Sequence, residues 1–220
     1  VYNSFLGYQS GVTNTEGSNN MFFGYQSGYH NTNGSNNIFI GKSSGYENLT
    51  GGDNVFIGVE AGRDNKTGIL NTYVGHQAGL LADSGRYNTL LGFWAGYHLY
   101  GGHLNTFIGA HAGHLAKTGE LNTVVGAYAG SEKDFGWHNT FIGMRAGSYN
   151  QGSGNTLLGS YAGVNNEMGR YNVMVGNSAG EWSKGEFNVY IGESAGLFDE
   201  GNNNVFIGRG AGGNNKRSHR

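Results

Sequence analysis

The side chains in this chain that could act in catalysis, metal binding or ligand recognition are its histidines, its carboxylates and its aromatic residues. The chain contains no cysteine. The absence of cysteine excludes disulfides, thiolate metal sites and a Cys nucleophile. The histidines closest together are His98, His103, His111 and His114, with His76 a short distance before them. If three copies of the chain assembled around a threefold axis, one inward-facing histidine from each copy could together form a three-ligand metal site. We favour exposed loop histidines that do not converge on one face, and therefore expect no bound metal or cofactor.

The acidic residues are too scattered to predict catalysis. Glycan cleavage needs two carboxyl groups at a defined separation. The 15 acids are instead spread over loop-like positions such as Glu16, Asp64, Asp83, Glu132 and Asp134. We expect them to solubilise the protein and expect no enzymatic activity. A catalytic pair made of two carboxylates from neighbouring repeats, or from neighbouring copies of the chain, stays an open alternative.

Aromatic residues are the best candidates for recognition. Many lie where the chain is otherwise polar and variable, and aromatic rings on a polar surface can stack on sugars or anchor a protein. The alternative is that they pack over corners of the fold or between subunits. The candidate ligand-binding residues are Trp94, Tyr97, Tyr100, Trp137, Tyr149 and Trp182.

Composition excludes two classes of partner. The formal net charge is −2 and only 13% of residues are charged, which gives no electrostatic reason to expect nucleic acid or an anionic membrane. No apolar run approaches the roughly 18 residues that would suggest a membrane span. We therefore predict no nucleic-acid partner and no membrane insertion of this chain.

A motif repeated thirteen times must position all of these side chains. It reads Asn, three mostly apolar residues, Gly, two variable residues, Ala or Ser, and Gly. Successive motifs are 17 residues apart for eight steps and then 16, 17, 16 and 16 apart. Such a regular period is typical of a repeat architecture. Its asparagines are Asn3, Asn20, Asn37, Asn54, Asn71, Asn88, Asn105, Asn122, Asn139, Asn155, Asn172, Asn188 and Asn204.

The glycines predict how each repeat turns. Three glycine sets recur in register, beginning at Gly7, Gly11 and Gly17, and they include most of the 43 glycines. Recurrent glycine indicates positive φ or close approach of a neighbouring backbone. Each repeat therefore has three sharp corners, or two corners and a tight contact. The fold class predicted is all-β, a β-solenoid (β-roll) of about 13 coils with 16–17 residues each, forming one domain over residues 1–220. The repeated asparagines are expected to form a hydrogen-bonded ladder between coils or to cap turns.

The apolar triplet predicts self-association. Side chains alternate between the two faces of a strand, and the second and third triplet positions are apolar or aromatic in all thirteen repeats. If one set fills the interior, the other forms an outward stripe that must be covered, most simply by copies of the same chain. The alternative is that a corner turns both inward. The candidate core or trimer stripe is Phe5, Phe22, Phe39, Phe56, Tyr73, Phe107, Phe141, Tyr190 and Phe206.

The motif resembles the head repeat of trimeric autotransporter adhesins, the YadA-type β-roll, and the glycine-rich repeats of bacterial and phage tail fibres. The resemblance covers the whole chain and implies three parallel rolls around one axis. This chain departs from it in a longer polar loop and in bulky residues such as Phe107 and Phe141 where a small one is usual. Handedness and the exact trimer contact are therefore left open.

We predict a rigid extracellular fibre or adhesin module, part of a longer fibrous protein on a cell surface or virion. It would bind surface glycans or proteins through its loops, or serve only as a spacer. One alternative is a phage tailspike that cleaves glycans. Another is an ice-binding solenoid, because a rank of threonines runs through Thr72, Thr89, Thr106, Thr123, Thr140 and Thr156. Against it, Val173, Val189 and Val205 replace Thr at one end, which we interpret as an inward-facing position.

Overall fold

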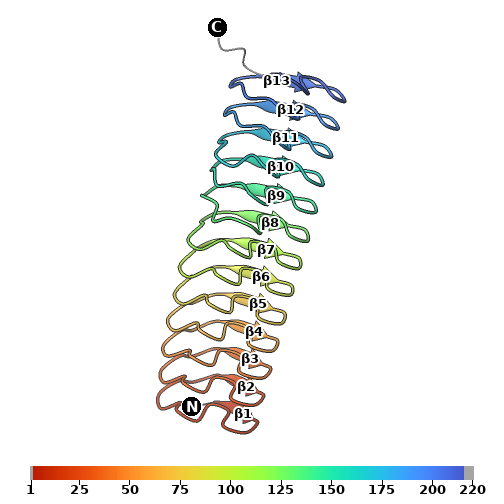
Figure 1. Ribbon diagram of the computed structural model, residues 1–220. Coiled ribbons are helices and arrows are strands. Elements are labelled where there is room, and N and C mark those ends of the chain that lie inside the picture. Colours follow the sequence, from red (N-terminus) through yellow and green to blue (C-terminus); the bar gives the residue numbers. More distant parts are fainter. Residues whose placement is uncertain (1, 216–220) are drawn as a thin grey trace.

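The computed structural model describes residues 2–215, which form a rod of stacked coils (Figure 1). Each coil contributes one three-residue strand, and the 13 strands form a single parallel sheet in chain order. The strands are β1 (Ser4–Leu6), β2 (Met21–Phe23), β3 (Ile38–Ile40), β4 (Val55–Ile57), β5 (Thr72–Val74), β6 (Thr89–Leu91), β7 (Thr106–Ile108), β8 (Thr123–Val125), β9 (Thr140–Ile142), β10 (Thr156–Leu158), β11 (Val173–Val175), β12 (Val189–Ile191) and β13 (Val205–Ile207).

Equivalent residues of successive repeats lie opposite one another in this sheet. Phe39 pairs with Phe56, for example, and the register holds across the shortened ninth repeat, where Leu157 pairs with Phe141. The described residues contain no helix, and the solenoid has about 12 turns. The predicted all-β solenoid is therefore confirmed. We number each coil by its strand.

Two of the three glycine sets form corners, and the third allows close packing. Gly92 and Gly96 have φ values of 139° and 57°, in the region that L side chains disfavour. Gly85, from the third set, shows no positive φ, but a Cβ atom there would lie 2.6 Å from the carbonyl oxygen of Gly102 in the next coil. Each repeat thus has two glycine corners and one tight contact, which is the second of the two predicted arrangements.

Non-glycine residues make two further corners in most coils. In coil 6, Trp94 has φ of 57°, and Tyr87, which immediately precedes the Asn of this coil, has φ of 58°. Left-handed backbone at a bulky residue costs roughly 1–2 kcal/mol. The stacked backbone hydrogen bonds offset this cost, because Trp94 N–H donates to His76 O and Tyr87 N–H donates to Ile69 O of the preceding coil.

The repeated asparagines form the predicted ladder and also tie each turn together. The side-chain oxygen of Asn88 accepts the backbone N–H of Asn105 at 3.0 Å, and its amide donates to the carbonyl oxygen of Gly102 at 2.8 Å. Between Asn71 and Asn122, each amide also donates to the oxygen of the preceding asparagine at 3.1–3.2 Å. Each asparagine therefore links its coil to both neighbours and fixes its own turn.

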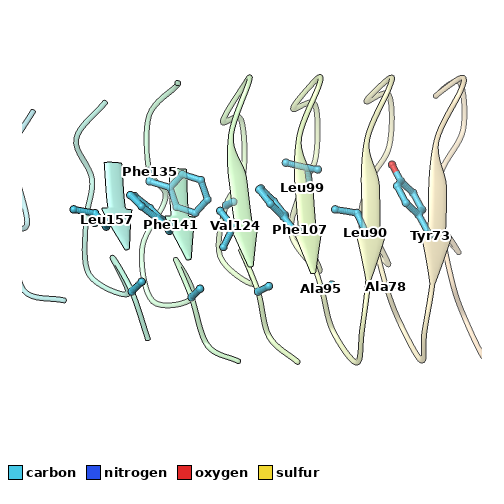
Figure 2. Packing of buried hydrophobic residues seen from close by; sticks show 14 of the residues in the cluster. Tyr73, Ala78, Leu90, Ala95, Leu99, Phe107, Val124, Phe135, Phe141 and Leu157 are labelled. Carbon is cyan, nitrogen blue, oxygen red and sulfur yellow. The ribbon is translucent and has the colours of Figure 1, made fainter. Parts of the chain in front are cut away.

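The middle residue of each strand fills the interior of the solenoid. These residues, called the interior rank, are fully buried from Phe22 to Tyr190, and Figure 2 shows several of them pointing inward from successive strands. Their rings stack where aromatic residues are consecutive, with centroids 4.8 Å apart for Phe22 and Phe39. This spacing equals that between neighbouring strands of a sheet. The predicted stripe Phe5, Phe22, Phe39, Phe56, Tyr73, Phe107, Phe141, Tyr190 and Phe206 is thus this interior rank, with Phe5 and Phe206 partly exposed in the end coils.

The opposite wall of the interior changes along the rod. It holds Asn14, Asn31, Asn48 and Asn65, then Ala82, Leu99 and Ala116, and later Asn150, Asn166, Ser183 and Asp199. In coil 8, Phe135 enters the space left by the small Val124, beside Phe141 (Figure 2). In coil 12, the buried carboxylate of Asp199 accepts hydrogen bonds from the Tyr190 hydroxyl and the Gly201 N–H. Burial and this carboxylate raise the pKa of Tyr190 well above its ordinary value.

The first and third strand residues point outward and form the outer sheet face. The first residues, called the threonine rank, include Thr72 and Thr89, both exposed, and Val173 and Val205, which are 36% and 65% exposed. The prediction that valine marks an inward-facing position is therefore wrong. Strand alternation places this rank on the face opposite to the buried middle residue. The third residues form an aliphatic rank on the same face, including Leu91 and Ile142, 45% and 41% exposed.

Candidate functional site: the loop edge

The segment between the second and third glycines of each coil forms a variable edge of the rod, which we call the loop edge. In coil 7 this segment is residues 114–118, and we include in the loop edge the residue that follows the third glycine, which is Glu120 in coil 7 and Trp137 in coil 8. Its sequence changes from coil to coil, whereas its backbone still pairs with the next coil, as in the 2.9 Å hydrogen bond from Tyr149 N–H to Val164 O. The fold therefore holds variable side chains on a regular backbone, which suits a recognition surface.

The six predicted aromatic candidates divide into three groups. Trp137 and Trp182 are 59% and 50% exposed, and each lines a surface hollow. Trp94 and Tyr97 belong to a histidine cluster described below, with Tyr100 at its margin. Tyr149 is half-buried in coil 9 and lines neither hollow. The structure thus brings two of the six to concave sites and does not bring all six together.

The first hollow has a volume of about 440 Å³ and lies over coils 7, 8 and 9. Trp137 supplies its aromatic surface, and Glu120, Asp134 and Gln151 supply polar groups. Its remaining lining residues are Thr118, Gly119, Phe135 and Gly136. Asp134 is held in place by the backbone N–H of Lys117, which donates to Oδ1 at 2.8 Å. The site therefore combines an aromatic ring with polar groups, one of which, the Asp134 carboxylate, is held by a backbone hydrogen bond.

The second hollow, of about 450 Å³, lies over coils 10 and 11. It is lined by Trp182 and Met168 together with Asn165, Glu167 and Lys184. Lys184 forms an ion pair with Glu200 of the next coil, with Nζ to Oε1 at 3.4 Å. Sequence reasoning did not identify Met168, Glu167, Glu120 or Gln151. Aligning the repeats on their asparagines would have placed these four residues in the same or the adjacent coil as a tryptophan, at nearby repeat positions.

Both hollows lie where a 17-residue coil is followed by a 16-residue coil. Coil 8, from Asn122, precedes the shorter coil 9, from Asn139; coil 10, from Asn155, precedes the shorter coil 11, from Asn172. The strands stay in register across both steps, so the missing residue shortens only the loop edge. A shorter loop beside a longer one leaves a recess, which explains why hollows occur at these two places.

Three histidines converge beside Trp94, so the prediction that they do not share one face is wrong. The ring centroid of His114 lies 5.1 Å from that of His98 and 5.4 Å from that of His111. Trp94 stacks on His114 with centroids 5.4 Å apart. These residues occupy different repeat positions, but the corner after the strand turns those positions toward one another. His103 and His76 lie outside the trio, His103 accepting the Arg86 N–H and His76 stacking on Phe93.

The electrostatics of this histidine cluster follow from partial burial. Burial lowers the pKa of His114 from its ordinary value of 6.5, and the neighbouring His98 and His111 lower it further, while Trp94 and Glu132 act in the opposite direction. Within residues 2–215, no group of three or more His, Asp or Glu side chains has the geometry to hold a metal ion.

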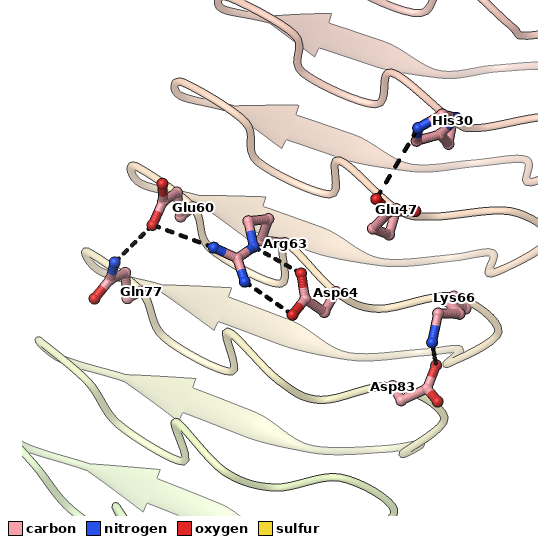
Figure 3. Close-up of polar contacts among 8 residues, drawn as sticks. All are labelled: His30, Glu47, Glu60, Arg63, Asp64, Lys66, Gln77 and Asp83. Carbon is pink, nitrogen blue, oxygen red and sulfur yellow. Dashed lines mark hydrogen bonds and ion pairs between the residues drawn. The ribbon is translucent and has the colours of Figure 1, made fainter.

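Charged residues elsewhere form isolated surface pairs. Figure 3 shows Arg63 bridging Asp64 and Glu60, with Arg63 Nε to Asp64 Oδ1 at 2.6 Å. Lys66 pairs with Asp83 of the next coil at 3.4 Å. These side chains are partly exposed, and exposed pairs contribute only about 0–1 kcal/mol each. Among the described residues, no helix is long and apolar enough to span a membrane.

Comparison with known proteins does not assign this chain to a family. Neither the family models nor the curated proteins searched give a match to this chain. The class of protein defined by the fold is a parallel β-solenoid repeat protein, which is compatible with a β-roll.

Proposed function

We propose that this chain is a rigid structural module of an extracellular fibre or adhesin, carried on a cell surface or virion. The observation that supports this most is the uninterrupted ladder, in which one sheet and one row of asparagines connect the coils over the length of the rod. A rod with coils so connected keeps its ends apart and displays its loop edge repeatedly. Binding on that edge would then gain strength from repetition.

The outer sheet face supports self-association. Thirteen strands at about 4.8 Å spacing, each three residues wide, give a face about 60 Å long and about 10 Å across. Such a face has an area of roughly 600 Å², close to the ~800 Å² that each partner buries in a stable interface. Leu70, Tyr87, Leu104 and Leu121, each 42–51% exposed, extend it on one side. We propose that copies of this chain cover this face, and that the YadA-type and tail-fibre resemblance makes the assembly a parallel homotrimer.

Light scattering after size-exclusion chromatography tests this proposal. A trimer has three times the chain mass of 23.4 kDa. A trimeric mass supports the fibre assembly, whereas a stable monomer at micromolar concentration contradicts it.

Ice binding is a second candidate function, favoured by the outward position of the threonine rank. Thr72 and Thr89 are exposed and pair in register on the parallel sheet. The rank is flanked by the aliphatic rank instead of a second row of threonines. Thermal hysteresis of the purified protein would support this function, and its absence at millimolar concentration would remove it.

We propose that the loop edge binds without catalysing a reaction. In the first hollow Glu120 and Asp134 bring two carboxylates to one site, whereas the second hollow has only Glu167. Release of reducing sugar from polysaccharides would contradict this proposal and favour the tailspike alternative.

A further inference from the structure

The two hollows of the loop edge are similar in side-chain composition, and both lie where a 17-residue coil is followed by a 16-residue coil. Each presents one exposed tryptophan beside carboxylate and amide side chains. An indole face can stack on the apolar face of a sugar ring, and carboxylates and amides can bind its hydroxyl groups. We propose that the two hollows are paired subsites for one chain of a neutral polysaccharide. This inference rests on the proposed function and names the class of ligand.

The backbone that carries the tryptophan of the first hollow is held by the following coil. The backbone N–H of Trp137 donates to Ser153 Oγ at 3.2 Å, and its carbonyl oxygen accepts the Gly154 N–H at 2.9 Å. Trp137 is 59% exposed, so its side chain is available to a ligand while its backbone is fixed. Only the two side-chain torsions of Trp137 then have to be ordered when a sugar binds.

The charges of the hollows select against acidic sugars. Glu120 and Asp134 both line the first hollow, and no basic residue lines it. A uronic acid there would meet two carboxylates and be repelled. In the second hollow, Glu167 accompanies Lys184, whose ammonium is already paired with Glu200. The first hollow therefore repels an acidic sugar, and the second offers it no net positive charge because Glu167 and Glu200 accompany Lys184. Both hollows suit neutral hydroxyl-bearing rings.

The positions of the hollows allow one ligand chain to occupy both. The first hollow lies over coils 7–9 and the second over coils 10 and 11, two to three coils apart, which corresponds to about 10–14 Å at 4.8 Å per coil. Trp182 follows the second glycine of its coil and Trp137 follows the third, so the two rings are also offset across the loop edge. An extended saccharide crossing the loop edge obliquely would meet Trp137 and then Trp182. Occupying two linked subsites raises the overall affinity above that of either one.

Affinity electrophoresis of the full chain in gels containing soluble β-glucan, mannan or arabinogalactan tests the inference, with polygalacturonate as the acidic comparison. We expect at least one neutral polysaccharide to retard the protein. The variants Trp137→Ala and Trp182→Ala should each weaken retardation by about tenfold, as for a central aromatic anchor. The matched control is Tyr100→Ala, because Tyr100 is 43% exposed on the same edge but lies in a coil flanked by 17-residue coils.

A second variant tests the hollow itself without touching a tryptophan. Insertion of one glycine after Gln151 restores 17 residues to coil 9 and should fill the first hollow. We expect this variant to keep its circular dichroism spectrum and to lose retardation as Trp137→Ala does. Unchanged retardation of the insertion variant would contradict the role of the coil-length step.

The remaining outcomes separate this inference from the proposed function. If the protein is trimeric but no neutral polysaccharide retards it, the inference is wrong and the fibre module stands. Retardation by polygalacturonate alone, or equal loss in Tyr100→Ala, would also overturn it. A monomer that still binds through Trp137 and Trp182 would support the subsites and contradict the fibre assembly.

Discussion

At the scale of single residues, the asparagine ladder concentrates many hydrogen bonds in few side chains. Asn88 accepts from the next coil, donates to the preceding asparagine and donates to Gly102, all in a buried environment. A buried group that loses its partner costs about 1–3 kcal/mol. The ladder therefore contributes to stability in addition to the aromatic interior.

We expect Asn88→Ala to lower the free energy of unfolding by roughly 3 kcal/mol, because it leaves the Asn105 N–H and the Gly102 carbonyl oxygen without partners. Urea denaturation followed by circular dichroism measures the change. The matched control is Asn33→Ala on the exposed loop edge, where we expect a change within about 0.5 kcal/mol. Equal effects of the two substitutions would contradict the role of the ladder.

The histidine cluster predicts sensitivity to acid. Because the pKa of His114 is lowered in the folded state, the unfolded chain binds more protons there, and stability falls as pH drops below the unfolded value of about 6.5. His98 and His111 face His114 and add repulsion when protonated. We expect the free energy of unfolding to fall more between pH 7.5 and pH 5.5 for the natural chain than for His114→Gln. Parallel losses in both proteins would show that His114 does not contribute.

At the scale of the structural elements, the corners determine whether coils can stack. Gly92 has φ of 139°, and a Cβ atom there would lie 2.5 Å from the carbonyl oxygen of Gly109. Gly101 has no positive φ, and the nearest atom to a Cβ there is Ser84 Oγ at 3.8 Å. Two glycines nine residues apart thus have different roles: Gly92 shapes the corner after the strand, and Gly101 lies in an open loop.

We expect Gly92→Ala to destabilise the solenoid by more than about 3 kcal/mol, since backbone strain and a clash with the next coil act together. Gly101→Ala should be neutral or stabilising by up to about 1 kcal/mol, because it only restricts the unfolded chain. The melting temperatures of the two variants, measured by thermal unfolding, test this difference. Similar melting temperatures would mean that coils can shift apart at the corner.

At the scale of the whole molecule, the apolar outer sheet face is the feature that a monomer leaves uncovered. The third residue of every strand is aliphatic except Phe23 in β2, and several members of this rank are more than a third exposed. A continuous apolar row along the whole rod is typical of a surface that another protein surface covers. The proposed self-association depends on this face, whereas the proposed rigidity of the rod depends on the ladder.

We expect the double variant Leu91→Lys, Ile142→Lys to abolish the proposed self-association and to keep the fold of the chain, because both side chains point outward. The matched control places lysine at the exposed loop-edge residues Thr67 and Ser84, and it should remain trimeric. Light scattering and circular dichroism report the two properties. Loss of circular dichroism in the sheet-face variant at low temperature would show that the face is part of the core.

The sequence by itself determined the period, the strands, the loop edge and the asparagine ladder, because each depends on contacts between equivalent residues of adjacent repeats. Alternation in the triplet showed that one apolar set faces inward, but it did not show which, since Phe107 and Ile108 are both apolar. Only the tertiary structure placed Phe107 inside and the threonine rank outside, because closure of the coil depends on the φ angles of its corners. The tertiary structure alone also showed that His98, His111 and His114 converge, because this depends on how the corners of adjacent coils stack in space. It likewise showed the recesses beside Trp137 and Trp182, which depend on how loops of unequal length stack.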